Sequence, residues 1–360
     1  MLICKTRYYH NVHCCWGELN KMVDDDFTPD QTSDVKPSPH SRIENMTGHD
    51  GPVSLQTGSR VIEAFRDEQP VGWIFLDKDL PPYAEIGGLL VNPKYKKEAE
   101  AIGEELISRS ISLAEKSNCN IFYTTEWKNS SNNKKNSLVQ EYGVIWQRLY
   151  AKYGFKPAII HNFDKNDVNI CLFNLSQSSC YNDFMLSHPL SILSISGGEI
   201  GYKGGLAYEM KWTDLQTGDF LAFYIEGKRE NVMPKIIGVS QKVGGIAFDA
   251  HINDTSDVNN LGEGTFKVHL VNHGQEPLVT YNTFLAPKGI TIDKDKLSNA
   301  ISEIRPGKEK SYEVSYCIEP HFKKPKVSSN TVLITWQLYI ENLSTYQVST
   351  GIRMDNVNIQ

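Results

Sequence analysis

Between residues 83 and 116 the pattern of hydrophobic and polar positions changes from that of a buried strand to that of an amphipathic helix. The apolar run at residues 86–91 is too short for a helix and is stopped by Asn92-Pro93, so it predicts a buried strand. After this turn, the spacing of apolar and polar residues predicts an amphipathic helix with one mainly apolar face and one polar face. The first face holds Ile102, Leu106, Arg109 and Leu113, and the second holds Glu104, Glu105, Ser108 and Ser112.

The expected helix begins with small side chains, at Ala99, Ala101 and Gly103. A helix start exposes unpaired backbone N–H groups and the positive end of the helix dipole. Small side chains also let an anionic group approach the backbone closely. The strand, turn and helix together therefore predict a receptor for a phosphate group.

Further strands and helices surround this stretch. Apolar runs at residues 61–65 and 71–76 flank a polar turn with Pro70, which predicts a β-hairpin. The whole pattern predicts an α+β domain over residues 1–176, with a mixed sheet and flanking helices. The other expected elements are, in chain order, a strand at 2–9, a short helix at 14–23, a polar stretch at 28–59, a strand at 120–125, a helix at 138–153 that ends at Gly154, and strands at 156–163 and 167–174.

The pattern changes in the rest of the chain, where short strand-like runs recur with turn signals between them. Many short strands without long helices are typical of an antiparallel β-sandwich, one large or two small, so we expect a second domain over residues 177–360. Only residues 293–302 resemble a short helix. The expected strands lie at residues 190–196, 206–212, 220–226, 235–241, 246–252, 265–271, 278–284, 311–317, 332–341 and 346–352.

Composition narrows the class of protein. A chain of 360 residues with 40% hydrophobic and 22% charged residues suits two globular domains. Its net charge of −6 gives no support for a nucleic-acid partner, and no apolar run is long enough to predict a membrane span. The 7 cysteines are scattered without paired spacing, which favours a reducing, cytoplasmic location. We expect no metal site, because His10, His13, Cys14 and Cys15 have no second cluster at ligand spacing.

Two motifs carry a resemblance to a known family. The run EIGGLLVNP at residues 85–93, followed by a lysine-containing turn and by Ala101-Ile102-Gly103 with Leu106, resembles the acetyl-coenzyme A strand, loop and helix of the GNAT superfamily of N-acetyltransferases. The run LYAKYGFK at residues 149–156 is similar to the signature that ends that family's last helix. The resemblance implies a GNAT-like acetyltransferase fold for residues 1–176, with acetyl-CoA as the co-substrate.

The resemblance also implies where acetyl-CoA would lie. Its pyrophosphate would contact the turn and the helix start, and backbone N–H groups near Leu90 and Val91 would stabilise the oxyanion that forms on the thioester carbonyl. The expected coenzyme-binding residues are Leu90, Val91, Lys96, Lys97, Ala99, Ala101, Ile102 and Gly103.

Two residues are expected to move protons during a direct acetyl transfer to an amine, in a small molecule or a protein. Glu85 stands where many family members have a carboxylate and would be the general base; a solvated glutamate at the strand edge is the alternative. Tyr150, four residues before Gly154, matches the family's thiolate-protonating tyrosine. Its phenol, with a reference pKa of about 10, can donate at neutral pH. A packing aromatic is the alternative for Tyr150.

Departures from the family pattern leave alternatives open. In one alignment with the family, Glu98 stands at the first position of the phosphate loop, where a basic or amide residue is usual. In a second alignment, shifted by two residues, Lys96 takes that first position and Ala99 and Ala101 follow it, so that the position carries a positive charge. Trp146 stands where the family often has alanine, and would narrow the coenzyme channel or stack within it. The second hypothesis is therefore a non-catalytic GNAT-like scaffold or binding protein, whose β-sandwich recognises a partner or a glycan.

A weaker resemblance concerns the C-terminal domain. Residues 266–278, 304–308 and 312–316 resemble immunoglobulin-like modules that are appended to bacterial enzymes and adhesins. The resemblance implies an immunoglobulin-like sandwich that recognises a partner or fixes a homodimer.

Overall fold

The computed structural model describes residues 2–8, 60–128, 137–164, 167–202, 205–226, 234–253, 259, 262–293, 301–320, 322 and 331–353. The chain separates into two compact units, with the main division between Leu175 and Ser176. The helix expected at residues 14–23 and the polar stretch at 28–59 lie outside the described residues.

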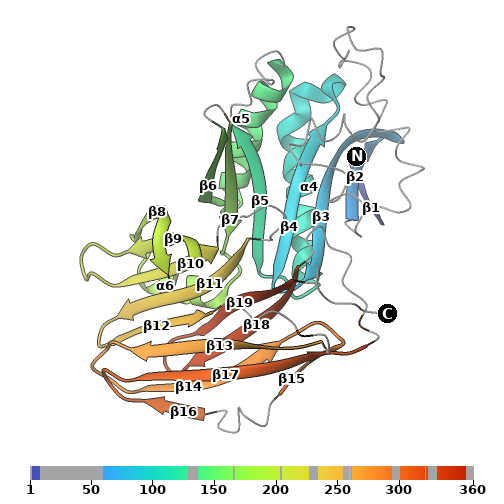
Figure 1. Ribbon diagram of the computed structural model, residues 1–360. Helices are drawn as coiled ribbons and strands as arrows, with labels where there is room; N and C mark the ends of the chain where they lie inside the picture. The colour runs from blue at the N-terminus through green and yellow to red at the C-terminus, as the bar shows by residue number, and fades with distance from the viewer. Residues whose placement is uncertain are drawn as a thin grey trace. The chain divides into compact units, whose positions relative to one another are not determined.

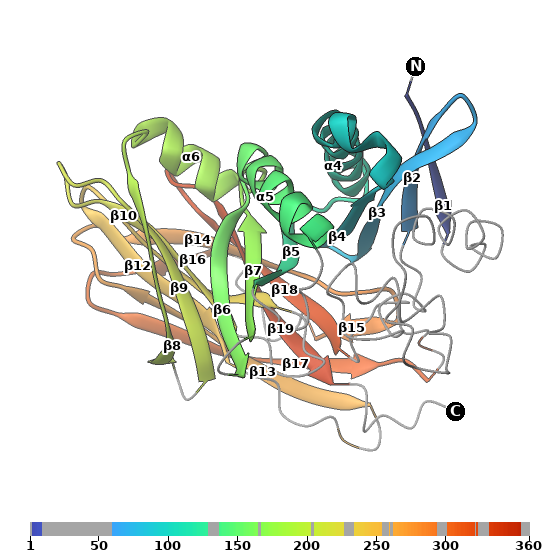
Figure 2. The ribbon, with the colours of Figure 1, turned by 90° about the horizontal axis from the view of Figure 1, so that it is seen from above.

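The N-terminal unit holds a 7-stranded sheet in the order β1-β2-β3-β4-β5-β7-β6. Strands β4 and β5 pair in parallel and all other neighbours are antiparallel, as a βαβ unit at the centre of the sheet requires. Helices α4 and α5 cover the same face of the sheet (Figure 2). The elements are β1 (Ile3–Tyr8), β2 (Arg60–Arg66), β3 (Gln69–Leu80), β4 (Tyr83–Val91), the 3-10 helix η2 (Pro93–Glu98), α4 (Ala99–Glu115), β5 (Ile121–Lys128), α5 (Ser137–Lys152), β6 (Lys156–Asp164) and β7 (Asp167–Asn174).

The expected hairpin is present as β2 and β3. Its turn consists of Asp67 and Glu68, both with positive φ, 48° and 65°. Two residues with positive φ match the right-handed twist of the strands, as in a type I′ turn. The turn is therefore shorter than the sequence pattern suggested, and Pro70 lies inside β3.

Helix α4 packs on the sheet through a stripe that differs from the expected one. Its buried side chains include Ile102, Leu106, Ser110 and Ala114, at successive four-residue steps. Arg109, which the sequence spacing grouped with Ile102 and Leu106, is exposed. Ser110 is accommodated because its hydroxyl donates to the carbonyl oxygen of Leu106, at 2.8 Å, and leaves no unsatisfied polar group.

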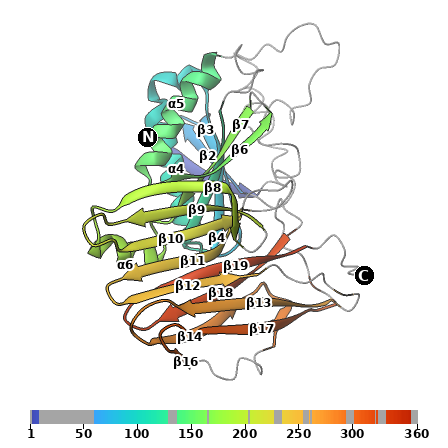
Figure 3. The ribbon, with the colours of Figure 1, turned by 60° about the vertical axis from the view of Figure 1, so that its left-hand side comes forward.

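The C-terminal unit holds an 8-stranded sheet, in the order β15-β17-β13-β12-β11-β10-β9-β8, and a 4-stranded sheet, in the order β16-β14-β18-β19. Figure 3 shows the strands of the larger sheet side by side. The elements are α6 (Ser179–Ser187), β8 (Ile192–Tyr202), β9 (Gly205–Thr213), β10 (Phe220–Glu226), β11 (Lys235–Val243), β12 (Ile246–Ile252), β13 (Glu263–Asn272), β14 (Leu278–Leu285), β15 (Ile290–Ile292), β16 (Ile301–Ile304), β17 (Glu309–Ile318), β18 (Thr331–Ile340) and β19 (Thr345–Arg353).

The two sheets of this unit pack together through aromatic side chains. The rings of Phe248 and Tyr346 lie edge-on, with centroids 5.0 Å apart, and those of Phe266 and Phe284 are 5.6 Å apart. The Tyr346 hydroxyl is satisfied in this core, because it donates to Oε1 of Gln241 at 2.6 Å. The all-β character expected of this half is therefore present, and its immunoglobulin-like nature stays a prediction.

The helix expected at residues 293–302 differs from the structure at both of its ends. The backbone N–H of Asp293 donates to the Ser315 carbonyl at 2.9 Å, which extends the edge pairing of β15, and residues 301–304 form strand β16. Residues 294–300 lie outside the described part of the chain. Helix α6, in contrast, was not expected, since its short segment falls at the junction of the two units.

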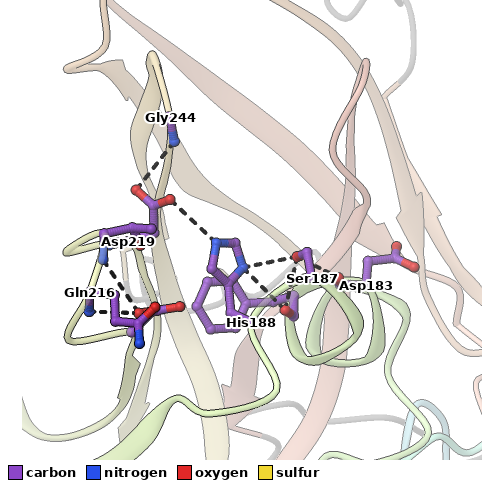
Figure 4. A network of polar contacts seen from close by, with 9 residues as sticks. Asp183, Ser187, His188, Gln216, Asp219 and Gly244 are labelled. Atoms are coloured by element: carbon purple, nitrogen blue, oxygen red, sulfur yellow. Dashed lines mark hydrogen bonds and ion pairs between the residues drawn. The ribbon is translucent and has the colours of Figure 1, made fainter.

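A buried polar network fastens the end of α6 to the larger sheet (Figure 4). His188 Nε2 lies 3.3 Å from Oδ2 of Asp219, whose Oδ1 accepts the Gly244 N–H at 3.2 Å. The His188 ring also stacks on Phe184, at 4.6 Å. Ser187 contacts Nδ1 of His188, but its hydroxyl also donates to helix carbonyls. The serine, histidine and aspartate thus terminate a helix rather than present a nucleophile.

We expect Asp219→Ala to lower the free energy of unfolding by about 1–3 kcal/mol, because it leaves the Gly244 N–H and the buried His188 ring without their acceptor. Urea unfolding measures this difference. Asp214→Ala, in which an exposed turn loses an acceptor for the Gln216 N–H, should cost less because water replaces that acceptor. Equal losses in the two variants would contradict the role of the network.

Candidate functional site

Strands β4 and β5 pair over only a short length. The parallel register joins Tyr83–Glu85 to Ile121–Tyr123 and ends there. Beyond Glu85, β4 continues beside β3 as far as Val91, while β5 continues beside β7. Figure 1 shows the two strands diverging beyond this point. Among the described residues, the edge of β4 that faces β5 therefore has no strand partner after Glu85, so a backbone edge is open to an extended ligand.

Tyr150 lies where the two strands part. Its hydroxyl donates to the carbonyl oxygen of Ile86 at 3.3 Å, and its ring packs edge-on against Phe155 at 5.1 Å. The position follows from the end of α5, where Gly154 adopts a positive φ of 88°. Glycine adopts this conformation without strain, and it lets the chain turn back so that the Phe155 N–H donates to the Tyr150 carbonyl.

Glu85 is the last residue of β4 that pairs with β5. It is half-buried, and its Oε2 accepts the hydroxyl of Tyr123, its cross-strand partner, at 3.3 Å. Burial, and then the nearby Glu85 carboxylate, raise the pKa of Tyr123 well above its usual value. Tyr123 therefore stays a hydrogen-bond donor to Glu85 at neutral pH. Sequence reasoning did not find Tyr123, because only the strand register brings it opposite Glu85.

The turn after β4 is fixed by its own residues. Asn92 caps η2, since its side chain accepts the Lys94 N–H at 3.0 Å, and Pro93 occupies the first turn. Helix α4 begins at Ala99. Lys96 and Lys97, both exposed, lie in the last turn of η2, directly before that helix start.

The two acidic residues at the helix start have arginine neighbours. Glu98 forms an ion pair with Arg66 of the β2–β3 hairpin, and Glu100 lies 3.3 Å from Arg148 of α5. These pairs are partly exposed and contribute little to stability. They do, however, offset the negative charge that the sequence places at this helix start.

Among the other expected site residues, Ala99 and Ile102 are buried on the sheet side of α4, and Ala101 is exposed. On β4, Val91 is buried and Leu90 pairs with β3. The structure thus places the expected residues along one strand edge and one helix start.

Gly103 is packed rather than open. A Cβ at this position would lie 2.8 Å from Cδ1 of Leu149 and 2.9 Å from Cζ3 of Trp146. Helices α4 and α5 approach closely here because glycine has no side chain. The Trp146 ring therefore fills the space between the two helices.

Gly103→Ala is expected to lower the free energy of unfolding by about 1–3 kcal/mol, because the methyl group would overlap Leu149 and Trp146. The higher helix propensity of alanine, about 1 kcal/mol, acts in the opposite direction. In a urea-unfolding cycle, the double variant with Leu149→Ala should lose less than the sum of the single losses. Equal or greater stability of Gly103→Ala would contradict the close helix approach.

Within the residues that the structure describes, no three His, Cys, Asp or Glu side chains form a group that could hold a metal ion. The sequence positions considered for metal, His10 to Cys15, lie outside those residues. In the same part of the chain, no helix combines the length and the apolar character that crossing a membrane needs.

The N-terminal part of the chain matches the model of a known protein family. Residues 19–155 match the model of the acetyltransferase (GNAT) family. The N-terminal part of this chain is a GNAT acetyltransferase domain. The resemblance seen in residues 85–93 and 149–156 is thereby confirmed, and the strand edge beside Tyr150 belongs to this GNAT domain.

Solved structures of low identity are also similar to the chain. An acyl-CoA N-acyltransferase from Pseudomonas aeruginosa is 15% identical, with 48% of this chain and 99% of that chain covered and a TM-score of 0.31. An N-acetyltransferase from Staphylococcus aureus Mu50 is 18% identical (48% and 97% covered, TM-score 0.31). The aminoglycoside 6'-N-acetyltransferase from Enterococcus faecium is 13% identical (48% and 96% covered, TM-score 0.33). No curated protein matches the chain.

Proposed function

We propose that this protein transfers an acetyl group from acetyl-CoA directly to an amine. One observation carries the proposal: the parallel pairing of β4 and β5 ends at Glu85, and the Tyr150 hydroxyl lies at Ile86, the next residue. An acyl carrier that lies along the open edge of β4 would therefore meet a proton donor. Acetyl-CoA supplies an acyl thioester whose carbonyl carbon accepts the amine nitrogen.

The chain offers three features that fit coenzyme A. The edge of β4 near Leu90 and Val91 can hydrogen-bond an extended pantetheine chain as another strand would. Backbone N–H groups that follow Ala99 at the start of α4 would bind the pyrophosphate, whereas the Ala99 N–H itself donates to the Lys96 carbonyl. Lys96 precedes the first residue of α4 by three positions. This spacing supports the alignment in which Lys96 is the first residue of the phosphate loop.

Proton movements follow from the same geometry. Glu85, held by Tyr123, accepts the proton that the amine loses, directly or through water. Tyr150 gives its hydroxyl proton to the departing thiolate, as its place beside Ile86 allows. The acceptor is an amine in a small molecule or a protein.

One observation favours the second hypothesis, a non-catalytic scaffold. Trp146 and Leu149 close on Gly103, which the sequence motif places in the phosphate loop. A coenzyme that needed the space between α4 and α5 would have to displace the Trp146 ring. In this alternative, the GNAT domain binds a partner without turnover.

We also propose that the two domains have different functions. Residues 1–176 would carry out acetyl transfer, and residues 177–360 would form an immunoglobulin-like sandwich that recognises a partner or fixes a homodimer. A reducing, cytoplasmic location is part of this proposal, and it is supported because no disulfide joins the described cysteines, Cys4, Cys119, Cys171, Cys180 and Cys317.

Acetyl-CoA should raise the free energy of unfolding by about 2–3 kcal/mol at roughly a hundred times its Kd. Thermal unfolding with and without acetyl-CoA measures this effect. The double variant Lys96→Ala/Lys97→Ala should weaken binding and reduce its salt dependence, because two cations beside the pyrophosphate are lost. Lys116→Ala, at the opposite end of α4, is the control. Unchanged melting in excess acetyl-CoA would contradict the proposal.

Tyr150→Phe is expected to lower kcat by about a hundredfold or more, because the leaving thiolate loses its proton donor. Steady-state turnover on a panel of amines measures this. Tyr153→Phe is the matched control, since Tyr153 directly follows α5 and its hydroxyl donates to the carbonyl of Glu104 in α4, at 3.1 Å. If wild type turns over no amine while acetyl-CoA still binds, or if Tyr150→Phe loses nothing, the assigned mechanism fails.

A further inference from the structure

The C-terminal unit contains a cavity of about 610 Å³ at one end of its larger sheet. Residues at the beginning of β13, the end of β15 and the end of β17 line it, and Glu263 and Thr291 among them are exposed. All the described residues that line this cavity belong to the C-terminal unit, so binding there can be tested apart from acetyl transfer.

The strand register arranges the polar residues of the cavity in two rows. Glu263 pairs with Cys317, which also pairs with Thr291. Thr265 pairs with Ser315, whose carbonyl accepts the Asp293 N–H at 2.9 Å. Directly paired residues share a face of a sheet, and so do residues two apart on one strand. All six side chains, Glu263, Cys317, Thr291, Thr265, Ser315 and Asp293, are therefore on the same face.

The two carboxylates stand at opposite corners of this array. Glu263 and Asp293 are separated by two inter-strand spacings, from β13 across β17 to β15, and by two residues along the strand direction. Their Cα atoms are therefore about 12 Å apart. Thr265, Thr291 and Ser315 lie between them in the array, and the Thr291 hydroxyl donates to the Cys317 carbonyl at 3.4 Å. Asn259 orients the first carboxylate, because its Nδ2 donates to Oε2 of Glu263 at 3.2 Å.

The charge of the lining selects among ligands. Among the ten described residues that line the cavity, two are acidic and none is Lys, Arg or His. Phosphate, sulfate and acidic sugars would be repelled there. A ligand with cationic groups at separated positions and hydroxyls between them would match the carboxylates and the threonine and serine hydroxyls.

We propose that this cavity is a binding site for an oligomeric amino sugar, whose ammonium groups pair with Glu263 and Asp293 and whose ring hydroxyls bond Thr265, Thr291 and Ser315. The volume of the cavity, the separation of the two carboxylates and the hydroxyl-bearing residues between them support this ligand. The site would add recognition of a cationic glycan to the function of the N-terminal unit.

Two tetrasaccharides that differ only in charge test the proposal. Titration calorimetry of the full chain, without acetyl-CoA and at slightly acidic pH, compares the glucosamine tetramer with the N-acetylglucosamine tetramer. The glucosamine tetramer should bind at least about tenfold more tightly, and added salt should weaken it. Glu263→Gln and Asp293→Asn should each weaken it by about threefold to tenfold.

A control and a second readout make the result specific. Glu309→Gln removes an exposed carboxylate from the far end of β17 and should leave affinity unchanged. The glucosamine tetramer should also slow alkylation of the half-buried Cys317 but not of Cys4, as read by peptide mass spectrometry. Equal affinity for the two tetramers, tighter binding of the acetylated one, no binding of either, or equal loss in Glu309→Gln would overturn the proposal.

Discussion

The parting of β4 from β5 is the constraint on which the GNAT domain depends. Parallel pairing is limited to the stretch from Tyr83 to Glu85. Beyond it, each strand is held by a different antiparallel neighbour, so the two cannot rejoin without breaking a ladder. The buried hydrogen-bonding groups of a β-strand normally require partners. An unpaired edge is therefore costly unless solvent or a ligand satisfies it, which makes this edge a natural place for an extended substrate.

Packing around this opening positions the chemical groups. The Phe155 ring, the Ile86 carbonyl and the positive φ of Gly154 hold Tyr150, and the strand register holds Tyr123 against Glu85. At the other end, Asn92 caps η2 and Pro93 begins it, and η2 leads directly into α4. The same close packing brings Trp146 onto Gly103, so the features that build a coenzyme site also narrow the space beside it.

In the C-terminal unit, polar groups lie in two kinds of place. Between its sheets, polar atoms such as the Tyr346 hydroxyl are satisfied internally, and the His188–Asp219 pair fastens α6. At the end of β13 and β17, polar side chains instead line a cavity. Some of these side chains also have protein partners, since the Thr291 hydroxyl donates to the Cys317 carbonyl and Asn259 donates to Glu263.

The sequence by itself determined the elements whose signals are local. The apolar run before Asn92-Pro93, the small residues before Gly103 and the glycine after Tyr150 predicted β4, α4 and the end of α5, because strand length, helix period and positive φ depend on neighbouring residues. Only the tertiary structure decided which distant residues meet. Tyr123 reaches Glu85, Arg66 reaches Glu98, and Asp293 extends an edge strand where a helix was expected. Strand register and side-chain pairing between distant segments set these contacts, and a local pattern does not encode them.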